Sequence, residues 1–248
     1  MRSGPIRYEA VLFDVGGVVL TPADARFEHA VRHVGVNYTA CEGQRVVARA
    51  VHFAAKTPRP AEFWASDQKA TFVAAALGIP HDRSHEFWSV LTGESGKDAS
   101  LPALWSDVAP DCIETISDLR SMGFKIGLVS NSDGTLSSLL CSSGIDHLFD
   151  DVIDSNVVGL AKPDERIFSL AAKRLGVDIA TVVFVGDDPF FDLRASQAVG
   201  VGLSILLDRY SLTDSLPAEN SSSAKISGLG ELISLLRPCA PTRKAHTF

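Results

Sequence analysis

The sequence predicts an α/β protein, with a Rossmann-like, doubly wound parallel sheet and a small inserted helical cap domain. The prediction depends on three short apolar runs, at residues 10–13, 125–129 and 181–185. Runs that are apolar on both faces and separated by helical segments are typical of strands buried in a parallel sheet. Residues 201–207 form a further candidate strand.

Three segments that lie between or beside these runs fit helices, and each of them ends at a glycine. They cover residues 111–122, 136–143 and 164–175. A glycine directly after the last helical residue is a common C-terminal signal, because it adopts the left-handed conformation without strain. These helices are expected to cover the two faces of the sheet.

The stretch from residue 21 to residue 99 has a different pattern. It contains no convincing buried strand and predicts several amphipathic helices, whose apolar faces carry Phe63, Trp64, Phe72, Phe87 and Trp88. We therefore expect a helical cap at residues 21–99, inserted as a lid into a core made of residues 1–20 and 100–237. Residues 238–248 are expected to form a flexible tail.

Composition and charge exclude some classes of partner. The 248-residue chain has a formal net charge of −7 and no basic run, which argues against a nucleic-acid surface. The apolar run at residues 199–207 is too short to cross a membrane. The four cysteines form no CxxC pair, as expected of thiols in a reducing compartment. These features predict a soluble, cytoplasmic protein.

Residues able to bind a phosphate or a cation follow the predicted strands. Asp14 comes after the first run, Ser130 after the second and Asp187 after the third, while Lys162 directly precedes a proline. A doubly wound sheet binds its ligands beyond the carboxyl ends of the strands, beside helix N-termini. A carboxylate, a hydroxyl, a lysine and an acidic cluster are the parts that phosphoryl transfer needs.

In this order, the motifs resemble those of the haloacid-dehalogenase-like (HAD) hydrolases over nearly the whole chain. The helical insertion also lies where the type-1 caps of that superfamily are found. Each of the four motifs is weak alone, and their combination is specific. The matching residues are, in chain order, Asp14, Ser130, Lys162 and the acidic group Asp187, Asp188 and Asp192.

The resemblance implies a Mg²⁺-dependent phosphohydrolase in which Asp14 is the covalent nucleophile and becomes an aspartyl-phosphate. Mg²⁺ would be bound by Asp14, by the backbone carbonyl of Gly16 and by Asp187, since this hard cation prefers oxygen ligands. Ser130 and Lys162 would bind the phosphate, and Lys162 would also tether Asp14.

Three other residues have more open roles. Asn131 either helps to place the substrate or is a turn residue. Asp188 or Asp192 would orient Asp187 or bind the water molecules of the metal. Asp188 fits equally well as an acid that stabilises a helix N-terminus. The expected substrate is a small phosphorylated metabolite.

The chain departs from the family pattern at Gly16. In the phosphatases of the superfamily, the residue two positions after the nucleophile is usually a second aspartate, which acts as general acid and base. Loss of such a group typically costs ~10²–10⁴ in rate. Three hypotheses remain: a phosphatase that does without this residue, a 2-haloacid dehalogenase, or a non-catalytic module that binds phosphate and metal. The acidic fourth motif favours phosphoryl chemistry, because its carboxylates are costly beside Asp14 without a cation.

Overall fold

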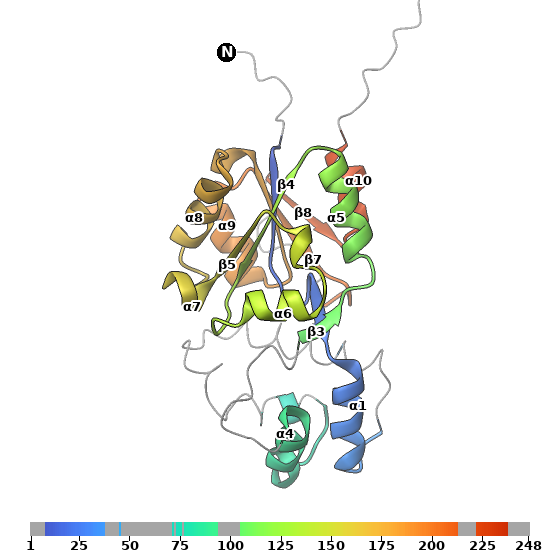
Figure 1. The fold of residues 1–248 in the computed structure, drawn as a ribbon. Helices are drawn as coiled ribbons and strands as arrows, with labels where there is room; N and C mark the ends of the chain where they lie inside the picture. Colours follow the sequence, from blue (N-terminus) through green and yellow to red (C-terminus); the bar gives the residue numbers. More distant parts are fainter. Residues whose placement is uncertain are drawn as a thin grey trace, which may run out of the picture.

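The computed structural model describes residues 8–37, 45, 71, 73–75, 77–93, 105–212 and 222–237. Its centre is a six-stranded parallel sheet with the strand order β5-β4-β1-β6-β7-β8 (Figure 1). In chain order the strands are β1 (Ala10–Phe13), β4 (Lys125–Ser130), β5 (Asp151–Asp154), β6 (Val182–Gly186), β7 (Leu203–Leu207) and β8 (Ser223–Ile226). The predicted α/β fold with a parallel sheet is confirmed.

Helices cover both faces of this sheet. The side chains of β1 point alternately to the two faces and belong to two different apolar clusters. Val11 and Phe13 face one cluster, whereas Ala10 and Leu12 face the other. The first cluster includes residues of α5 (Cys112–Ser121), α6 (Leu136–Ser142) and α10 (Glu231–Leu236), and the second includes residues of α8 (Arg166–Leu175) and α9 (Ala195–Ala198). The short helix α7 (Ser155–Val158) follows β5. The three predicted core helices correspond to α5, α6 and α8.

The two edge strands of the sheet, β5 and β8, were not predicted from the sequence. β5 begins and ends with an aspartate, and β8 contains only one fully buried side chain, that of Ile226. An edge strand is partly open to solvent, so its sequence need not be a continuous apolar run. The central strands β1, β4 and β6 are buried on both faces and were therefore recognisable.

A second, two-stranded sheet joins β2 (Leu20–Pro22) and β3 (Trp105–Val108) in antiparallel pairing. The expectation that residues 21–99 contain no buried strand was wrong at the start of this range, because β2 continues through Thr21 to Pro22. A strand of three residues is too short to show a period-2 pattern, which explains the miss. β2 leads directly toward α1, and Figure 1 shows β3 between this helix and the main sheet.

Within the predicted cap, the helices α1 (Asp24–His33) and α4 (Ser84–Thr92) pack against each other, and a short 3₁₀ helix, η2 (His81–Arg83), precedes α4. Their shared apolar cluster contains Phe27 and Phe87, whose ring centroids lie 6.5 Å apart. Both helices lie beyond the carboxyl end of β1 (Figure 1). The expected apolar positions Phe63, Trp64 and Phe72 and the tail 238–248 are outside the described residues.

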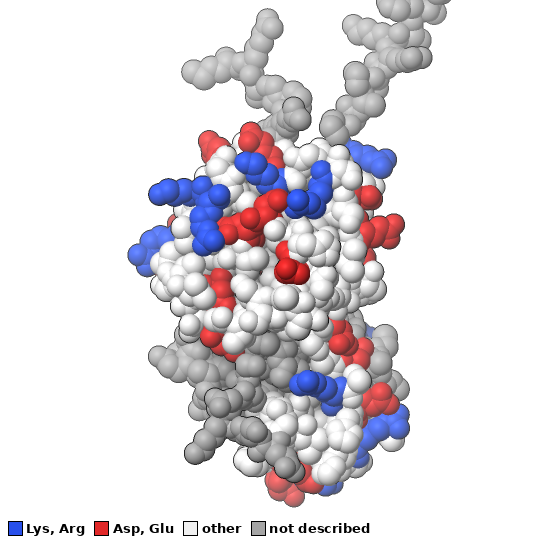
Figure 2. Space-filling view, in the orientation of Figure 1, with Lys and Arg blue, Asp and Glu red and all other residues white. Residues whose placement is uncertain are grey.

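Charged side chains of both signs are interspersed on the face of the molecule drawn in Figure 2. This distribution fits the absence of any basic run in the sequence. Among the helices that the structure describes, none is both long enough and apolar enough to cross a membrane.

Candidate active site

Asp14 directly follows the central strand β1, at the carboxyl edge of the sheet. Its backbone N–H donates to the carbonyl of Val185 on β6, at 2.8 Å, which continues the strand pairing by one residue. The Asp14 side chain is 13% exposed, so a small ligand can reach a carboxylate that is otherwise enclosed.

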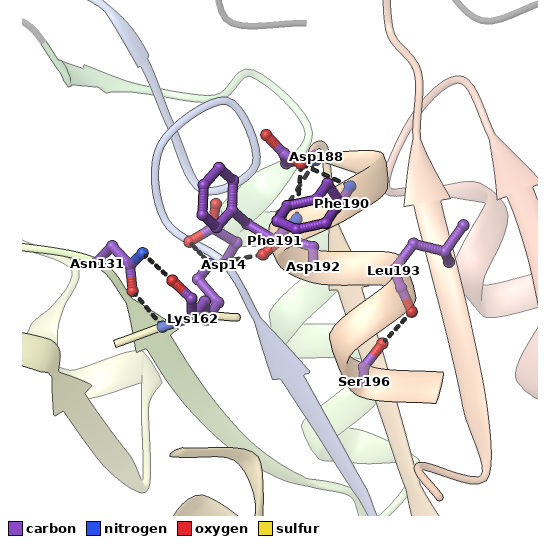
Figure 3. Close-up of polar contacts among 9 residues, drawn as sticks. All are labelled: Asp14, Asn131, Lys162, Asp188, Phe190, Phe191, Asp192, Leu193 and Ser196. Carbon is purple, nitrogen blue, oxygen red and sulfur yellow. Dashed lines mark hydrogen bonds and ion pairs between the residues drawn. The ribbon is translucent and has the colours of Figure 1, made fainter. Parts of the chain in front are cut away.

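Lys162 lies between two carboxylates. Its Nζ atom donates to Oδ1 of Asp14 and to Oδ1 of Asp192, both at 2.6 Å (Figure 3). The lysine side chain is only 3% exposed. Burial alone lowers the pKa of Lys162, but the two carboxylates outweigh it and raise this pKa above its usual value, so the ammonium stays charged.

Asn131 holds the backbone of Lys162. Its Nδ2 donates to the Lys162 carbonyl at 2.8 Å, and the Lys162 N–H donates to its Oδ1 at 2.7 Å (Figure 3). Asn131 directly follows β4, so these two bonds connect the end of that strand to the lysine. The nitrogen and the oxygen of the Asn131 side-chain amide are thus both bonded to the backbone of Lys162, the residue whose side chain reaches Asp14.

The acidic fourth motif follows β6 and continues into a π-helix, η6 (Pro189–Arg194). Asp188 caps this helix: its Oδ1 accepts from the N–H groups of Phe190 and Phe191, at 2.7 and 2.8 Å. Asp192 lies inside the helix, where its Oδ2 accepts from the Asp188 N–H at 3.1 Å. The side chain of Asp188 therefore caps the helix, and that of Asp192 reaches Lys162.

Asp14, Asp187 and Asp192 each offer a carboxylate oxygen within 4.8 Å of the others. Burial raises the pKa of Asp14 to about 7 although Lys162 acts in the opposite direction. Burial, followed by the charges of the neighbouring aspartates, raises the pKa of Asp187 well above its usual value. Three carboxylates beside one ammonium leave an excess of negative charge when all are ionised. This oxygen donor set and its charge fit a hard divalent cation.

The turn after Asp14 requires a glycine at position 17. Gly17 has φ +79°, and a Cβ atom built there would overlap Oδ2 of Asp187. At Gly16, a Cβ atom would instead lie 3.5 Å from Cδ2 of Trp105, which is an ordinary contact. The turn is also held from outside, because Arg209 donates from Nη2 to the carbonyl of Val18 at 3.2 Å.

Ser130 ends the strand next to β1 and is buried. Because Phe13 pairs with Leu128, Asp14 and Ser130 leave the sheet at the same edge. The structure thus brings Asp14, Lys162, Asp187 and Asp192 into one cluster, with Ser130 on the adjacent strand. The sequence named each of these residues, but it gave no signal for the contact of Trp105 with position 16.

Comparisons with known proteins give the family. A family model described as haloacid dehalogenase-like hydrolase matches residues 8–200. The mouse (Mus musculus) haloacid dehalogenase-like hydrolase domain-containing protein 3 is 39% identical over 105 residues, which are 42% of this chain and 41% of that protein. A glyceraldehyde 3-phosphate phosphatase from Methanopyrus kandleri is 40% identical over 93 residues, 37% of this chain and 40% of that protein. The matches thus span about two fifths of each relative.

A crystal structure of a dehalogenase with an intermediate complex has a TM-score of 0.67 at 22% identity, and the match covers 94% of this chain and 98% of the other. At this identity the likeness concerns the fold alone. The family model, however, matches most of the chain, from before β1 to after α9. The chain therefore belongs to the haloacid dehalogenase-like hydrolases.

Proposed function

We propose that this protein is a magnesium-dependent phosphatase that acts on a small phosphorylated metabolite through an aspartyl-phosphate on Asp14. The observation that carries the proposal is the cluster in which Lys162 bridges Asp14 and Asp192 beside Asp187. The similarity to the Methanopyrus kandleri phosphatase supports a phosphorylated substrate.

In this mechanism an oxygen of Asp14 attacks phosphorus, and the bond from phosphorus to the leaving oxygen breaks. Lys162 favours the ionised form of Asp14 and orients it, and with Ser130 it binds the non-bridging phosphate oxygens. Asp192 positions Lys162 from the other side, and Asn131 fixes the backbone of the lysine. These contacts hold the nucleophile in place before the substrate arrives.

Asp14, Asp187 and the backbone carbonyl of Gly16 are the proposed ligands of Mg²⁺. When bound there, the cation would neutralise the aspartates and polarise the phosphate oxygens. Asp188 is not included, because its side chain already caps η6.

The same cluster disfavours a dehalogenase. Displacement of a halide by Asp14 needs no metal, so a second and a third carboxylate beside the nucleophile would only add repulsion in a buried site. In a Mg²⁺-dependent phosphatase, in contrast, the bound cation would compensate the negative charge of these carboxylates.

We also propose that residues 21–99 act as a cap that closes over the carboxyl edge of the sheet. The helix pair α1 and α4 lies beyond this edge and has its own apolar cluster, which supports movement as a unit. Closure would exclude water and select the substrate.

A paired assay tests the function. Phosphate release from a panel of phosphate esters is measured with and without Mg²⁺, beside halide release from 2-haloacids. We expect phosphate release that depends on Mg²⁺ and is lost in Asp14→Asn. Halide release that is indifferent to chelator would replace the proposal with dehalogenation. Retained binding of phosphate without either product would indicate a non-catalytic module.

A further inference from the structure

Trp105 takes up the space next to Gly16, the position at which a second aspartate would stand. A Cβ atom built on Gly16 lies 3.5, 3.6 and 3.8 Å from Cδ2, Cε2 and Cε3 of the indole. Cδ2 is a ring-fusion carbon whose three bonds lie in the ring plane, so an atom that meets it first approaches from the face. The first atom of a side chain at position 16 would therefore rest against the face of the indole.

The position of this indole is fixed by its neighbours. Trp105 is the first residue of β3 and pairs with Pro22 of β2. Its side chain is partly buried and packs against both the apolar cluster of the sheet and the cluster of α1 and α4. The indole cannot move away from Gly16 without losing contacts on both sides.

The face of an aromatic ring is its electronegative side. A carboxylate placed against that face would be repelled and would also lose part of its hydration. Trp105 thus disfavours an anionic acid/base at position 16, and it gives the space beside Gly16 an apolar surface. The glycine at position 16 is therefore compatible with the indole of Trp105, whereas an aspartate at this position is not favoured.

Building on the phosphatase function proposed above, we infer that Trp105 selects phosphate compounds whose leaving group departs as a stable anion and has a flat apolar body. Aryl phosphates have this chemistry. The oxygen of Asp14 forms a bond to phosphorus, the phosphorus–oxygen bond of the ester breaks, and its electron pair leaves on the aryl oxygen without a proton. Water then attacks phosphorus, returns the carboxylate of Asp14, and loses its proton to the released phosphate.

A series of aryl phosphates tests the kinetic part, with leaving groups whose pKa runs from about 4 to about 10. In the wild type we expect kcat/KM to fall steeply as the leaving group becomes more basic. Gly16→Asp should not flatten this dependence. The double variant Gly16→Asp/Trp105→Ala should flatten it, with a gain on the most basic leaving groups of at least 10-fold, toward the ~10²–10⁴ range of a placed acid.

The inference would be overturned if kcat/KM of the wild type did not depend on the pKa of the leaving group. It would also be overturned if the single variant Gly16→Asp, which retains Trp105, flattened this dependence. Trp105→Phe keeps an aromatic ring and serves as the matched control, and circular dichroism checks that every variant is folded.

Binding supplies a readout that does not need turnover. Phenylphosphonate and methylphosphonate are titrated calorimetrically in the presence of Mg²⁺. We expect the phenyl compound to bind about 3- to 10-fold more tightly, the range of one aromatic contact. The preference should persist in Trp105→Phe and be lost in Trp105→Ala. An equal preference in wild type and Trp105→Ala contradicts the role of Trp105. If no ester is hydrolysed, the phosphatase function fails while this comparison still decides the inference.

Discussion

At the scale of single residues, Lys162 is the group on which the cluster depends. It is a buried ammonium in contact with two buried or nearly buried carboxylates, and Asn131 fixes its backbone. A buried charge is tolerated only when its partners are in place, so the loss of one member affects all the others.

The substitution Lys162→Met removes the charge and keeps a similar length. Asp14 and Asp192 then face each other without a counter-ion, and we expect a loss of about 3–5 kcal/mol in the free energy of unfolding. Phosphatase activity should fall to background. Urea denaturation in EDTA measures the stability, with Lys173→Met on the exposed face of α8 as the matched control. Equal stability of the two variants would contradict the role assigned to Lys162.

The two neighbouring glycines in the turn after Asp14, Gly16 and Gly17, form a natural pair for a second test. Gly17→Ala places a Cβ atom against Asp187 in a left-handed conformation, which alone costs roughly 1–2 kcal/mol. Gly16→Ala meets Trp105 at an ordinary contact distance and keeps the proposed carbonyl ligand. We therefore expect Gly17→Ala to lower both stability and Mg²⁺ affinity, and Gly16→Ala to change neither by much.

Thermal unfolding and calorimetric Mg²⁺ titration of both glycine variants give the answer. A Gly17→Ala protein that binds Mg²⁺ like the wild type would show that the turn does not need glycine at this position.

At the scale of elements, α8 is attached to the sheet mainly by its apolar face. Phe168 on α8 and Phe184 on β6 are both fully buried. Their rings meet edge to face, with 4.9 Å between the ring centroids. Phe184 belongs to the strand that ends just before Asp187, and Lys162 also lies 5.8 Å from the centre of its ring. The packing of α8 thus supports the strand that presents the fourth motif.

Phe168→Ala removes this contact and leaves a cavity. A buried Phe→Ala change typically costs about 3–5 kcal/mol, and we expect a loss in that range. Chemical denaturation measures it, with Val157→Ala as a control at a side chain that is 71% exposed. A decrease in the free energy of unfolding below about 1 kcal/mol would mean that neighbouring side chains fill the cavity, and that the contact of Phe168 with Phe184 contributes little.

The sequence was a good guide to the elements wherever burial imposed a pattern. β1, β4 and β6 are apolar on both faces, and α5, α6 and α8 end near glycines, so all six could be predicted. The paired strands β2 and β3 could not, because one has three residues and the other is only partly buried.

For the site, the order of the motifs was enough to name the residues, but their contacts depend on tertiary distances. Asp192 bonds to Lys162 from a π-helix, whereas Pro189 signals no more than the start of a helix. The proximity of Trp105 to Gly16 brings the start of β3 next to the turn after β1, and no local pattern connects these two segments.

At the scale of the whole molecule, the cluster of aspartates couples folding to pH and, through the proposed metal site, to Mg²⁺. The pKa of Asp14 is about 7 in the folded protein, above its unfolded value of 3.8. The folded state therefore holds this proton more tightly, and its contribution to stability is present at low pH and is lost as the pH rises through about 7. A bound cation would favour the ionised form and reverse this loss.

We accordingly expect the increase in Tm caused by Mg²⁺ to grow between pH 5.5 and pH 8, since below about 7 the cation must displace the proton of Asp14. Differential scanning fluorimetry across this range, with Mg²⁺ or EDTA, measures the effect. Asp187→Asn should reduce it at every pH. An increase in Tm that is independent of pH, or equal in Asp187→Asn, would place the cation elsewhere.

The position of β1 in the middle of the sheet has a consequence for synthesis on the ribosome. This strand precedes the other five strands of the sheet along the chain, and its two neighbours, β4 and β6, follow it by more than 100 residues. Asp14 therefore has neither Lys162 nor Asp187 and Asp192 beside it until the chain has been synthesised past β6. Binding of a metal ion at this cluster would require that β1 has already paired with β6.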